Sequence, residues 1–396
     1  MNNPLGLSKT KLNDIFLDVN TLYRDNVEEV ISEHVLRGLK KLFENALKAE
    51  VLGYVKARWY KRSKARVDSR NGFRYRNLAT AFGIVKAIKV PRTRKNGYQF
   101  QIFDRYQRRW RKVDQFIREI FIGGVSTRNV GWVMRSLVGK TVSASTVSSV
   151  CKVLDHEVGQ FHRQPLADDY IYLFLDGVRQ RMVSCGKAVK KLVLVAYGIK
   201  TNGQRAVIDF RVAKSESEHD WTVFLNSLYQ RGLQGKGLRL IITDGAPGLL
   251  KALDMLYPYV DRQRCWVHKE RNVANYIPRR HQKECLGELK KIYLASTYRA
   301  AVKHYQQWCR KWRDLVPKAV ACLEKDIEEL LVFYKQDKKL WVKIRTTNAI
   351  ERLFKELRRR TRPMNLFANE ESCQRIVYAL FAKYNKKWED RQYAIF

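Results

Sequence analysis

Asp169-Tyr170-Ile171-Tyr172-Leu173-Phe174-Leu175-Asp176-Gly177 is the stretch that decides the fold. Apolar and aromatic residues follow one another without a break from Tyr170 to Leu175, and a carboxylate and a glycine then end the run. An uninterrupted apolar run of this length is typical of a strand buried on both faces. We therefore expect Asp176 at the rim of a hydrophobic core, where it either serves chemistry or simply marks where the strand meets water.

A second stretch, Leu238-Arg239-Leu240-Ile241-Ile242-Thr243-Asp244-Gly245, has the same order of residues. It also has the pattern of a buried strand that ends in Asp-Gly, here at Asp244. Either aspartate alone could be an ordinary strand-end or turn residue. Two such strands in one chain favour a site in which Asp176 and Asp244 act as paired carboxylates.

The composition of the 396-residue chain is that of a globular protein, with 45% hydrophobic and 12% aromatic residues. Its length predicts about two to four domains. No apolar run approaches the roughly 18 residues that cross a bilayer, and the N-terminus lacks a signal-peptide core. The seven cysteines include no CxxC pair, which favours a reducing compartment over a disulfide framework. We expect a cytoplasmic protein.

The charge balance indicates the partner. Lysine and arginine number 77 against 39 acidic residues, a formal net charge of +38. Such a charge favours a polyanion, because each phosphate that a basic side chain neutralises releases a counterion. Solubility alone is the alternative explanation. The basic residues are clustered and interleaved with aromatic ones, however, and this pattern favours nucleic acid.

The chain before residue 166 is predicted to hold three modules. Residues 1–55 form an N-terminal helical module, because apolar residues recur at broadly helical spacing over 12–57, although this could equally be a packing helix alone. Residues 56–112 form a basic, β-containing DNA-binding element. Its turn signals and strand-like segments are Asn71-Gly72, Asn96-Gly97, 83–91 and 98–103.

Aromatic residues such as Trp59, Phe73 and Tyr75 lie among the basic residues of the 56–112 element. This mixture suits contacts with the DNA backbone and stacking on bases. A solvated basic surface is the alternative. The DNA-contacting residues expected in this element and in the helices that follow it are Arg70, Arg74, Arg76, Lys86, Lys89 and Arg128.

The third module, residues 113–165, is predicted to contain three short helices. The first covers 114–122, the second follows a cap at Ser126 and ends at Gly139, and the third follows a cap at Ser143 or Ser145 and continues to about His162. Short helices with a glycine turn in a basic protein are typical of a helix-turn-helix DNA-binding domain. An ordinary three-helix linker is the alternative.

After Pro165 the pattern is strand, strand, strand, helix, strand, helix, strand, and carboxylates end the first and fourth strands. This is the order of the RNase H fold, although a fold by analogy does not give a function. The predicted strands are 170–175, 192–197, 205–213, 238–243 and 259–260, and the predicted helices are 220–229 and 247–256.

The rest of the chain is almost wholly helical in pattern. A helical segment over 264–340 separates the first part of the core, 166–263, from its last part, 341–396, which contains a helix starting near Thr347 and another over 370–388. The predicted fold class is therefore α/β. It is an RNase H-like catalytic core interrupted by an all-helical insertion and preceded by helical and small basic β DNA-binding modules.

Phosphodiester chemistry predicts a third carboxylate. Two Mg²⁺ ions about 3.5–4 Å apart can activate a hydroxyl and stabilise the leaving oxygen, and they need carboxylates that converge. Glu351 is the candidate, because it lies in the first turn of a helix whose face continues with basic residues. A simple ion pair with Lys355 is the alternative. The phosphate-binding residues expected there are Arg345, Arg352, Lys355, Arg358 and Arg359.

Two further clusters of polar residues are weighed separately. Cys265-x-x-His268 offers two zinc ligands, which is half a site, so we expect a structural or DNA-positioning role for Cys265, Trp266 and His268. Trp266 could stack on an unpaired base, but core packing explains it at least as well. The acids around His219 are interpreted as the N-terminus of a helix.

Segments spread over nearly the whole chain resemble the Mutator-type transposases of bacterial insertion sequences, a branch of the DDE recombinase superfamily. The resemblance implies that Asp176, Asp244 and Glu351 are the catalytic triad and ligate two Mg²⁺ ions, for which Mn²⁺ can substitute. The segments that carry it are Arg70-Asn71-Gly72-Phe73-Arg74-Tyr75-Arg76, Gly124-Val125-Ser126-Thr127-Arg128, Leu175-Asp176-Gly177, Thr243-Asp244-Gly245, Gln263-Arg264-Cys265-Trp266-Val267-His268-Lys269 and Thr346-Thr347-Asn348-Ala349-Ile350-Glu351-Arg352.

The resemblance also implies the reaction and the partners. The expected enzyme binds the terminal inverted repeats of an insertion sequence and cleaves and transfers DNA strands with Mg²⁺. Its partners would be double-stranded DNA, both element ends and target, and a second copy in a homodimer, with no membrane or small-molecule substrate. It would be cytoplasmic and associated with the nucleoid. The alternatives are a transposase-derived regulator without catalysis and a structure-specific nuclease.

Overall fold

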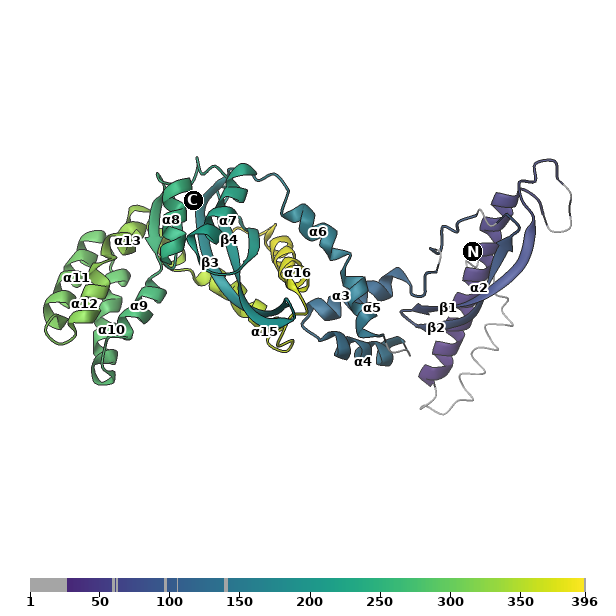
Figure 1. The fold of residues 1–396 in the computed structure, drawn as a ribbon, viewed down its shortest axis with the longest axis horizontal. Coiled ribbons are helices and arrows are strands. Elements are labelled where there is room, and N and C mark those ends of the chain that lie inside the picture. Colours follow the sequence, from purple (N-terminus) through teal and green to yellow (C-terminus); the bar gives the residue numbers. More distant parts are fainter. Residues whose placement is uncertain are drawn as a thin grey trace, which may run out of the picture. The chain divides into compact units, whose positions relative to one another are not determined.

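The computed structural model describes residues 27–58, 61, 63–95, 98–104, 106–138 and 142–394. The chain divides into two compact units, Met1–Val150 and Cys151–Phe396 (Figure 1). The predictions for residues 12–26, Trp59, the Asn96-Gly97 turn and the end of a helix at Gly139 lie outside the described residues. None of the described helices is both long and apolar enough to cross a membrane.

The first unit is built on one long helix, α2 (Val27–Val55), and an antiparallel hairpin of β1 (Arg70–Thr80) and β2 (Gly83–Thr93). Apolar residues of the helix pack on those of the hairpin. They include Leu47 of α2 and Leu78, Val85, Ile88 and Val90 of the strands. The predicted helix and the predicted basic β element are confirmed in these described parts.

Two details of that element are wrong. Asn71-Gly72 is not the hairpin turn but lies within β1, where the register shifts and Gly72 has a φ of +66°. Such a bulge uses the same left-handed conformation as a turn, so the sequence signal is the same for both. The turn itself is Ala81-Phe82, and residues 98–103 form no strand.

Helices α3 (Arg111–Ile122), α4 (Thr127–Val138) and α5 (Ala144–Cys151) follow. The predicted caps are confirmed. The backbone N–H of Asn129 donates to Ser126 Oγ at 3.3 Å, and that of Thr146 donates to Ser143 Oγ at 3.2 Å. Ser143 and not Ser145 therefore caps the third helix.

The predicted continuation of that helix to His162 is wrong. It ends at Cys151, and a separate helix, α6 (Leu154–Phe161), begins after Lys152-Val153. The reason is tertiary, because α6 packs on α16 (Glu370–Trp388), where the Arg375 guanidinium binds both carboxylate oxygens of Asp155. The helix propensity of the segment could not predict this contact between distant residues.

The second unit is centred on a mixed sheet with the strand order β5-β4-β3-β6-β7. Strand β4 pairs antiparallel with both β3 and β5, and β6 and β7 run parallel to β3. The predicted succession of strands and helices is confirmed. The strands are β3 (Tyr170–Ser184), β4 (Lys187–Lys200), β5 (Arg205–Ala213), β6 (Leu240–Thr243) and β7 (Asp261–Arg264).

Four of the five strands differ from their predicted bounds. Strand β4 extends beyond 192–197 at both ends, and β6 begins at Leu240 and not at 238. Asp176 does not end β3, because β4 pairs with β3 as far as Ser184 and holds the backbone extended after β6 has ended opposite Leu175. The last strand is shifted to Asp261–Arg264, and Tyr259, placed in it by the pattern, is 99% exposed. In β3 the apolar run reflects burial and not the length of the ladder, whereas the last strand, Asp261–Arg264, contains no apolar residue that could mark it.

Helices cover both faces of the sheet. Trp221 and Phe224 of α7 (Glu218–Gln230) and Leu249 of α8 (Pro247–Leu256) pack in one core with sheet residues such as Leu173. Helix α16 and helix α15 (Asn348–Thr361) contact other sheet positions, with the rings of Phe381 and Phe210 5.6 Å apart. The acids near His219 do form the N-terminal turn of α7, capped by Ser217, as predicted.

The predicted helical block is confirmed and lies at one end of the second unit, in green in Figure 1. Trp266 is fully buried, and its indole N–H donates to the Leu330 carbonyl at 2.7 Å, so it packs in the core and does not face a base. The block comprises α9 (Trp266–Ala274), α10 (Arg279–Leu294), α11 (Tyr298–Trp312), α12 (Pro317–Glu324), α13 (Ile327–Leu331) and the short 3₁₀ segments η2 (Val332–Lys335) and η3 (Lys338–Leu340). Helix α14 (Trp341–Ile344) follows it.

Gly198→Ala is expected to destabilise the second unit by about 1–3 kcal/mol, because a Cβ at this position of β4 would clash with the Tyr170 ring and lie 2.9 Å from Ile208 Cδ1. Gly287→Ala is the matched control. Its Cβ would meet no atom within 4 Å, and alanine is favoured over glycine in a helix by about 1 kcal/mol. Thermal unfolding should show a lower Tm for the first variant and a higher one for the second; equal values would contradict the packing described here.

Candidate active site and nucleic-acid interface

Strands β3 and β6 bring Asp176 and Asp244 to neighbouring positions. Leu175 pairs with Thr243 in the parallel ladder, and Asp176 and Asp244 are the residues that directly follow these two. Asp176 is only 7% exposed, whereas Asp244 is half-buried and accepts a hydrogen bond from the Ala246 N–H at 3.0 Å. The paired arrangement predicted from the two Asp-Gly strands is thus present in the fold.

Burial raises the pKa of the Asp176 carboxyl to about 7. The negative charge of Asp244 is the second contribution to this increase and that of Glu351 a smaller one, while the Gly177 N–H, donating at 2.7 Å, and His268 oppose it. A carboxylate in this environment is costly to ionise unless a positive charge lies beside it. The surroundings of Asp176 therefore fit a bound cation.

Glu351 approaches this carboxylate pair from the first turn of α15. The helix is held by a buried apolar face that includes Ile350 and Phe354. Glu351 Oε1 lies 3.4 Å from His268 Nε2 and 3.9 Å from a guanidinium nitrogen of Arg271. The hydrogen bond from His268 is the main reason that the pKa of Glu351 is lowered.

Asp176, His268 and Glu351 each place one potential ligand atom within 4.8 Å of the others. Carboxylate oxygens suit Mg²⁺ and Mn²⁺, and imidazole nitrogen suits transition metals. The sequence analysis predicted Asp176 and Glu351 as ligands of one site, and the structure places these two side chains close together. The sequence analysis did not assign His268 to this group. Asp244 is not a member of the three-residue group, although its charge acts on Asp176.

Cys265 connects the end of β6 with the start of α15. Its N–H donates to the Thr243 carbonyl at 2.8 Å, and its buried Sγ accepts from both the N–H and the hydroxyl of Thr347 at 3.3 Å. Next to it, the Trp266 N–H donates to the Arg345 carbonyl at 3.1 Å. These bonds fix the residues that precede Asp244 and Glu351, and they give the Cys-x-x-His segment a structural role.

His268 is the point where this segment meets the carboxylates. Its Nδ1 is buried and has no well-aligned hydrogen-bond partner among the described residues. The nearby Cys265 thiol, and then Glu351, raise the pKa of His268 to about 10. The group of three potential metal-ligating side chains found among the described residues contains His268 but not Cys265.

Arg271 is a site residue that the sequence analysis missed. It lies one helical turn after His268, so both side chains leave the same face of α9. Arg271 is 63% exposed even though it contacts Glu351, and most of its donors are therefore open to solvent. The only sequence signal for Arg271 was its spacing of three residues from His268. That spacing points to the site only when the position of α9 beside α15 is known.

The basic residues predicted around Glu351 differ in their surroundings. Arg345 donates to the Tyr293 carbonyl at 2.8 Å and stacks on the Tyr293 ring, and burial lowers its pKa. Arg358 is half-buried and its charge acts on Glu351. The remaining three, all exposed on α15, are Arg352, Lys355 and Arg359, the last paired with Glu356 at 2.8 Å.

The ion pair proposed as an alternative for Glu351 is not formed. Its described ionic partners are His268 and Arg271, and Lys355 is not among them. The side chain is therefore directed toward α9 and the carboxylate pair, and not along its own helix.

The basic residues predicted in the first unit also divide into two groups. Arg70 donates to the Ala57 carbonyl at 2.7 Å, and Arg76 lies over the Phe103 ring with 5.2 Å between the guanidinium carbon and the centroid. The others are exposed side chains on β1, β2 and α4, namely Arg74, Lys86, Lys89 and Arg128.

Comparison with known proteins identifies the family. The family model "Transposase, Mutator family" matches residues 13–391. The chain is 33% identical to the transposase for insertion sequence element ISRM5 of Rhizobium meliloti (strain 1021), over 88% of this chain and 87% of that one. It is 30% identical to the transposase for insertion sequence element IS256 in transposon Tn4001 of Staphylococcus aureus, over 94% of both chains.

Among solved structures, the Drosophila P element transposase strand transfer complex matches over 76% of this chain and 84% of that chain, with 13% identity and a TM-score of 0.29. That similarity is too low to transfer any feature. The family match and the curated relatives confirm the resemblance inferred from the sequence motifs. The chain belongs to the Mutator family and is a transposase of the insertion-sequence type.

Proposed function

We propose that this transposase binds the terminal inverted repeats of its element, cleaves DNA there and joins the freed 3′-hydroxyl to a new phosphate. The observation that carries the proposal is the convergence of Asp176, Asp244 and Glu351, from three distant parts of the chain, at one edge of the sheet. A protein that only binds DNA does not need a buried carboxylate with a raised pKa beside two other acids.

The proposed fold of this core is RNase H-like. The strand order β5-β4-β3-β6-β7, with two parallel strands after three antiparallel ones, supports it, as does the carboxylate at each of the two central strands. We propose that the core consists of residues 166–263 and 341–396 and that the helical block of residues 264–340 is an insertion. Through Cys265 and His268 this insertion supports Glu351.

The donor set fits divalent cations of the Mg²⁺ or Mn²⁺ type. Asp176, Asp244 and Glu351 would hold them, since Asp176 needs a neighbouring positive charge and its partners offer oxygen ligands. Two bound Mg²⁺ ions supply activation of the attacking hydroxyl and stabilisation of the leaving oxygen. His268 is a further nitrogen ligand in reach or, through Nε2, the group that orients the Glu351 carboxylate.

The chain's own cations would hold the phosphate. Arg271 is mostly exposed beside Glu351, so its free donors can bind the oxygens of the phosphate under attack. The duplex next to it would contact the exposed basic residues of α15. They are Arg352, Lys355 and Arg359, and the half-buried Arg358 lies among them on the same helix. Arg345 has no part in this proposal, because its guanidinium is bonded to Tyr293 inside the protein.

The first part of the chain would recognise the element ends. We propose that residues 56–112 and 113–165 are DNA-binding domains, supported by the exposed Arg74, Lys86, Lys89 and Arg128. Two copies of the chain would pair two ends, as a homodimer. Residues 1–55 would serve as an accessory helical module.

The test is strand cleavage by purified protein on labelled duplexes that carry the element ends. With Mg²⁺ we expect nicks at the ends and joined products, both lost when EDTA removes the metal. A duplex with scrambled ends is the control. Binding without any cleavage would instead support the non-catalytic regulator, and cleavage without joining would support the nuclease.

A further inference from the structure

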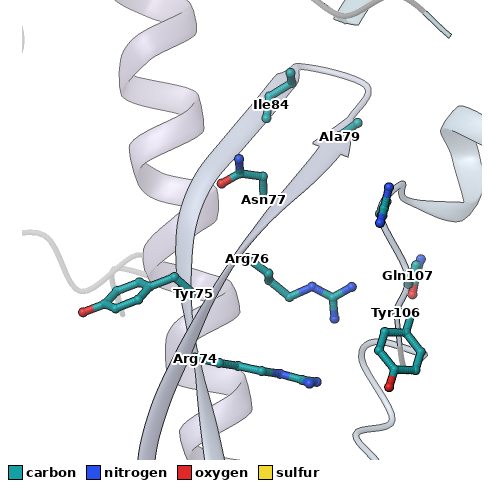
Figure 2. A pocket seen from close by; sticks show the side chains of 9 residues that line it. Arg74, Tyr75, Arg76, Asn77, Ala79, Ile84, Tyr106 and Gln107 are labelled. Carbon is teal, nitrogen blue, oxygen red and sulfur yellow. The ribbon is translucent and has the colours of Figure 1, made fainter.

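Arg74 and Arg76 form an unusual pair in the first unit. They lie two residues apart on β1, so their side chains leave the same face of the strand, whereas Tyr75 points to the opposite face (Figure 2). Figure 2 shows both guanidinium groups directed toward the segment that carries Tyr106 and Gln107. We call the two side chains the arginine pair.

Two surface hollows meet at the arginine pair. One has a volume of about 420 Å³ and is also lined by Tyr106, Gln107 and Arg108. The other has a volume of about 480 Å³ and is also lined by Arg92 and Phe103. Both hollows combine positive charge with an aromatic ring, and the arginine pair is the wall that they share.

Among the described residues, no acidic side chain forms an ion pair with either member of the arginine pair. The ion pairs of the described part of the first unit are Arg37–Glu33, Arg109–Asp114 and Arg111–Asp104, and none includes Arg74 or Arg76. Asp104, the acid that lines the second hollow, is the partner of Arg111 at 3.8 Å. Burial, and then the charge of Arg74, lowers the pKa of Arg76.

A half-buried guanidinium beside a second one is unfavourable unless an anion lies between them. The Phe103 ring stabilises Arg76 from one side only and supplies no negative charge. The arrangement therefore favours an external anion with several oxygen atoms, and two guanidinium forks match the non-bridging oxygens of a phosphate.

We propose that the arginine pair is a phosphate-binding site for one strand of the element-end duplex, which passes through the two hollows. The proposal rests on the proposed DNA binding and locates one phosphate contact at the arginine pair. Arg70 was predicted to contact DNA together with Arg74 and Arg76. It donates to the Ala57 carbonyl instead and is not part of the site. Arg108 and Arg92 flank the site and would contact the adjacent phosphates.

The test compares the full chain with the double variant Arg74→Ala/Arg76→Ala and the control Arg37→Ala/Lys41→Ala. The control removes the same charge from exposed positions of α2 in the same unit. Fluorescence anisotropy would give the Kd for an element-end duplex and for a scrambled duplex over a series of salt concentrations. Because the pair would contact phosphate, affinity should fall about tenfold or more for both duplexes, and the salt slope should decrease by about 1–2.

The control variant should lose less than about threefold, since its charges do not converge on one site. A second variant, Arg74→Gln/Arg76→Gln, keeps a polar, uncharged side chain at both positions and should reproduce the loss with an unchanged Tm. Unchanged affinity in both arginine variants, or a loss confined to the element-end duplex, would overturn the phosphate assignment. Failure of the wild type to cleave the DNA that it binds would instead contradict the proposed catalysis and leave the binding comparison valid.

Discussion

Asp176→Asn and Asp244→Asn are each expected to lower strand cleavage by about 10³-fold or more, equal to about 4 kcal/mol of transition-state stabilisation. Asparagine keeps the shape of the side chain and can still accept the Gly177 N–H hydrogen bond that Asp176 accepts. What it removes is the negative charge that a cation requires. Binding of the element-end duplex should change by less than about threefold.

Asp176→Asn is also expected to affect stability. Replacing a structural residue lowers the Tm, whereas this substitution should leave the Tm unchanged or raise it. Burial raises the pKa of Asp176 to about 7, so stability is lost as the pH rises from the ordinary aspartate pKa to about 7, and the loss stays constant at higher pH. The neutral amide has no such cost. In metal-free buffer at neutral pH the variant should have a Tm equal to or above that of the wild type, and Mg²⁺ should raise the Tm of the wild type only.

The matched control is Asp254→Asn, the same chemical change at a 64% exposed residue of α8 that pairs with Arg262 at 2.6 Å. It should cleave at the wild-type rate and show no altered response to Mg²⁺. Cleavage by Asp176→Asn within about tenfold of the wild type would show that the buried carboxylate is not part of the reaction. A large loss of Tm would mean that its role is structural.

The central sheet was predictable because its signals are local and strong. Strand β5, helix α8 and helix α16 have the predicted bounds, since an apolar pattern coincides there with end signals such as Pro247 at the start of α8 and the Asn369 cap of α16. Asp176 was placed at a strand end for the opposite reason. Its position inside β3 depends on pairing with β4, and the apolar run does not predict which residues pair.

The candidate site shows the same division. Asp176, Asp244 and Glu351 could be chosen because carboxylates at strand ends and in a first helical turn follow from the chemistry of phosphodiesters. The roles of His268 and Arg271 could not, because they depend on how α9 lies against α15. That placement is set by contacts such as Cys265 with Thr347, which join residues far apart in sequence.

Arg271→Ala is expected to lower cleavage about 10²-fold, the usual cost of removing one donor to a developing negative charge. Arg271→Lys should recover part of the loss, because lysine restores the charge but not the planar fork. The Kd for the duplex should stay within about threefold of the wild type, since one phosphate contact among many is lost. Arg310→Ala, an exposed arginine on α11, is the control and should cleave normally.

The same variant separates two roles for Arg271. If the residue only neutralises Glu351, which it contacts at 3.9 Å, its removal should strengthen Mg²⁺ binding and leave the rate at saturating Mg²⁺ unchanged. If it binds the phosphate, the loss should persist at saturating Mg²⁺. A duplex with a neutral methylphosphonate at the scissile position should then remove the difference between wild type and variant, because the oxygen charge that Arg271 would bind is absent. A tenfold or larger difference on that duplex would contradict the phosphate role.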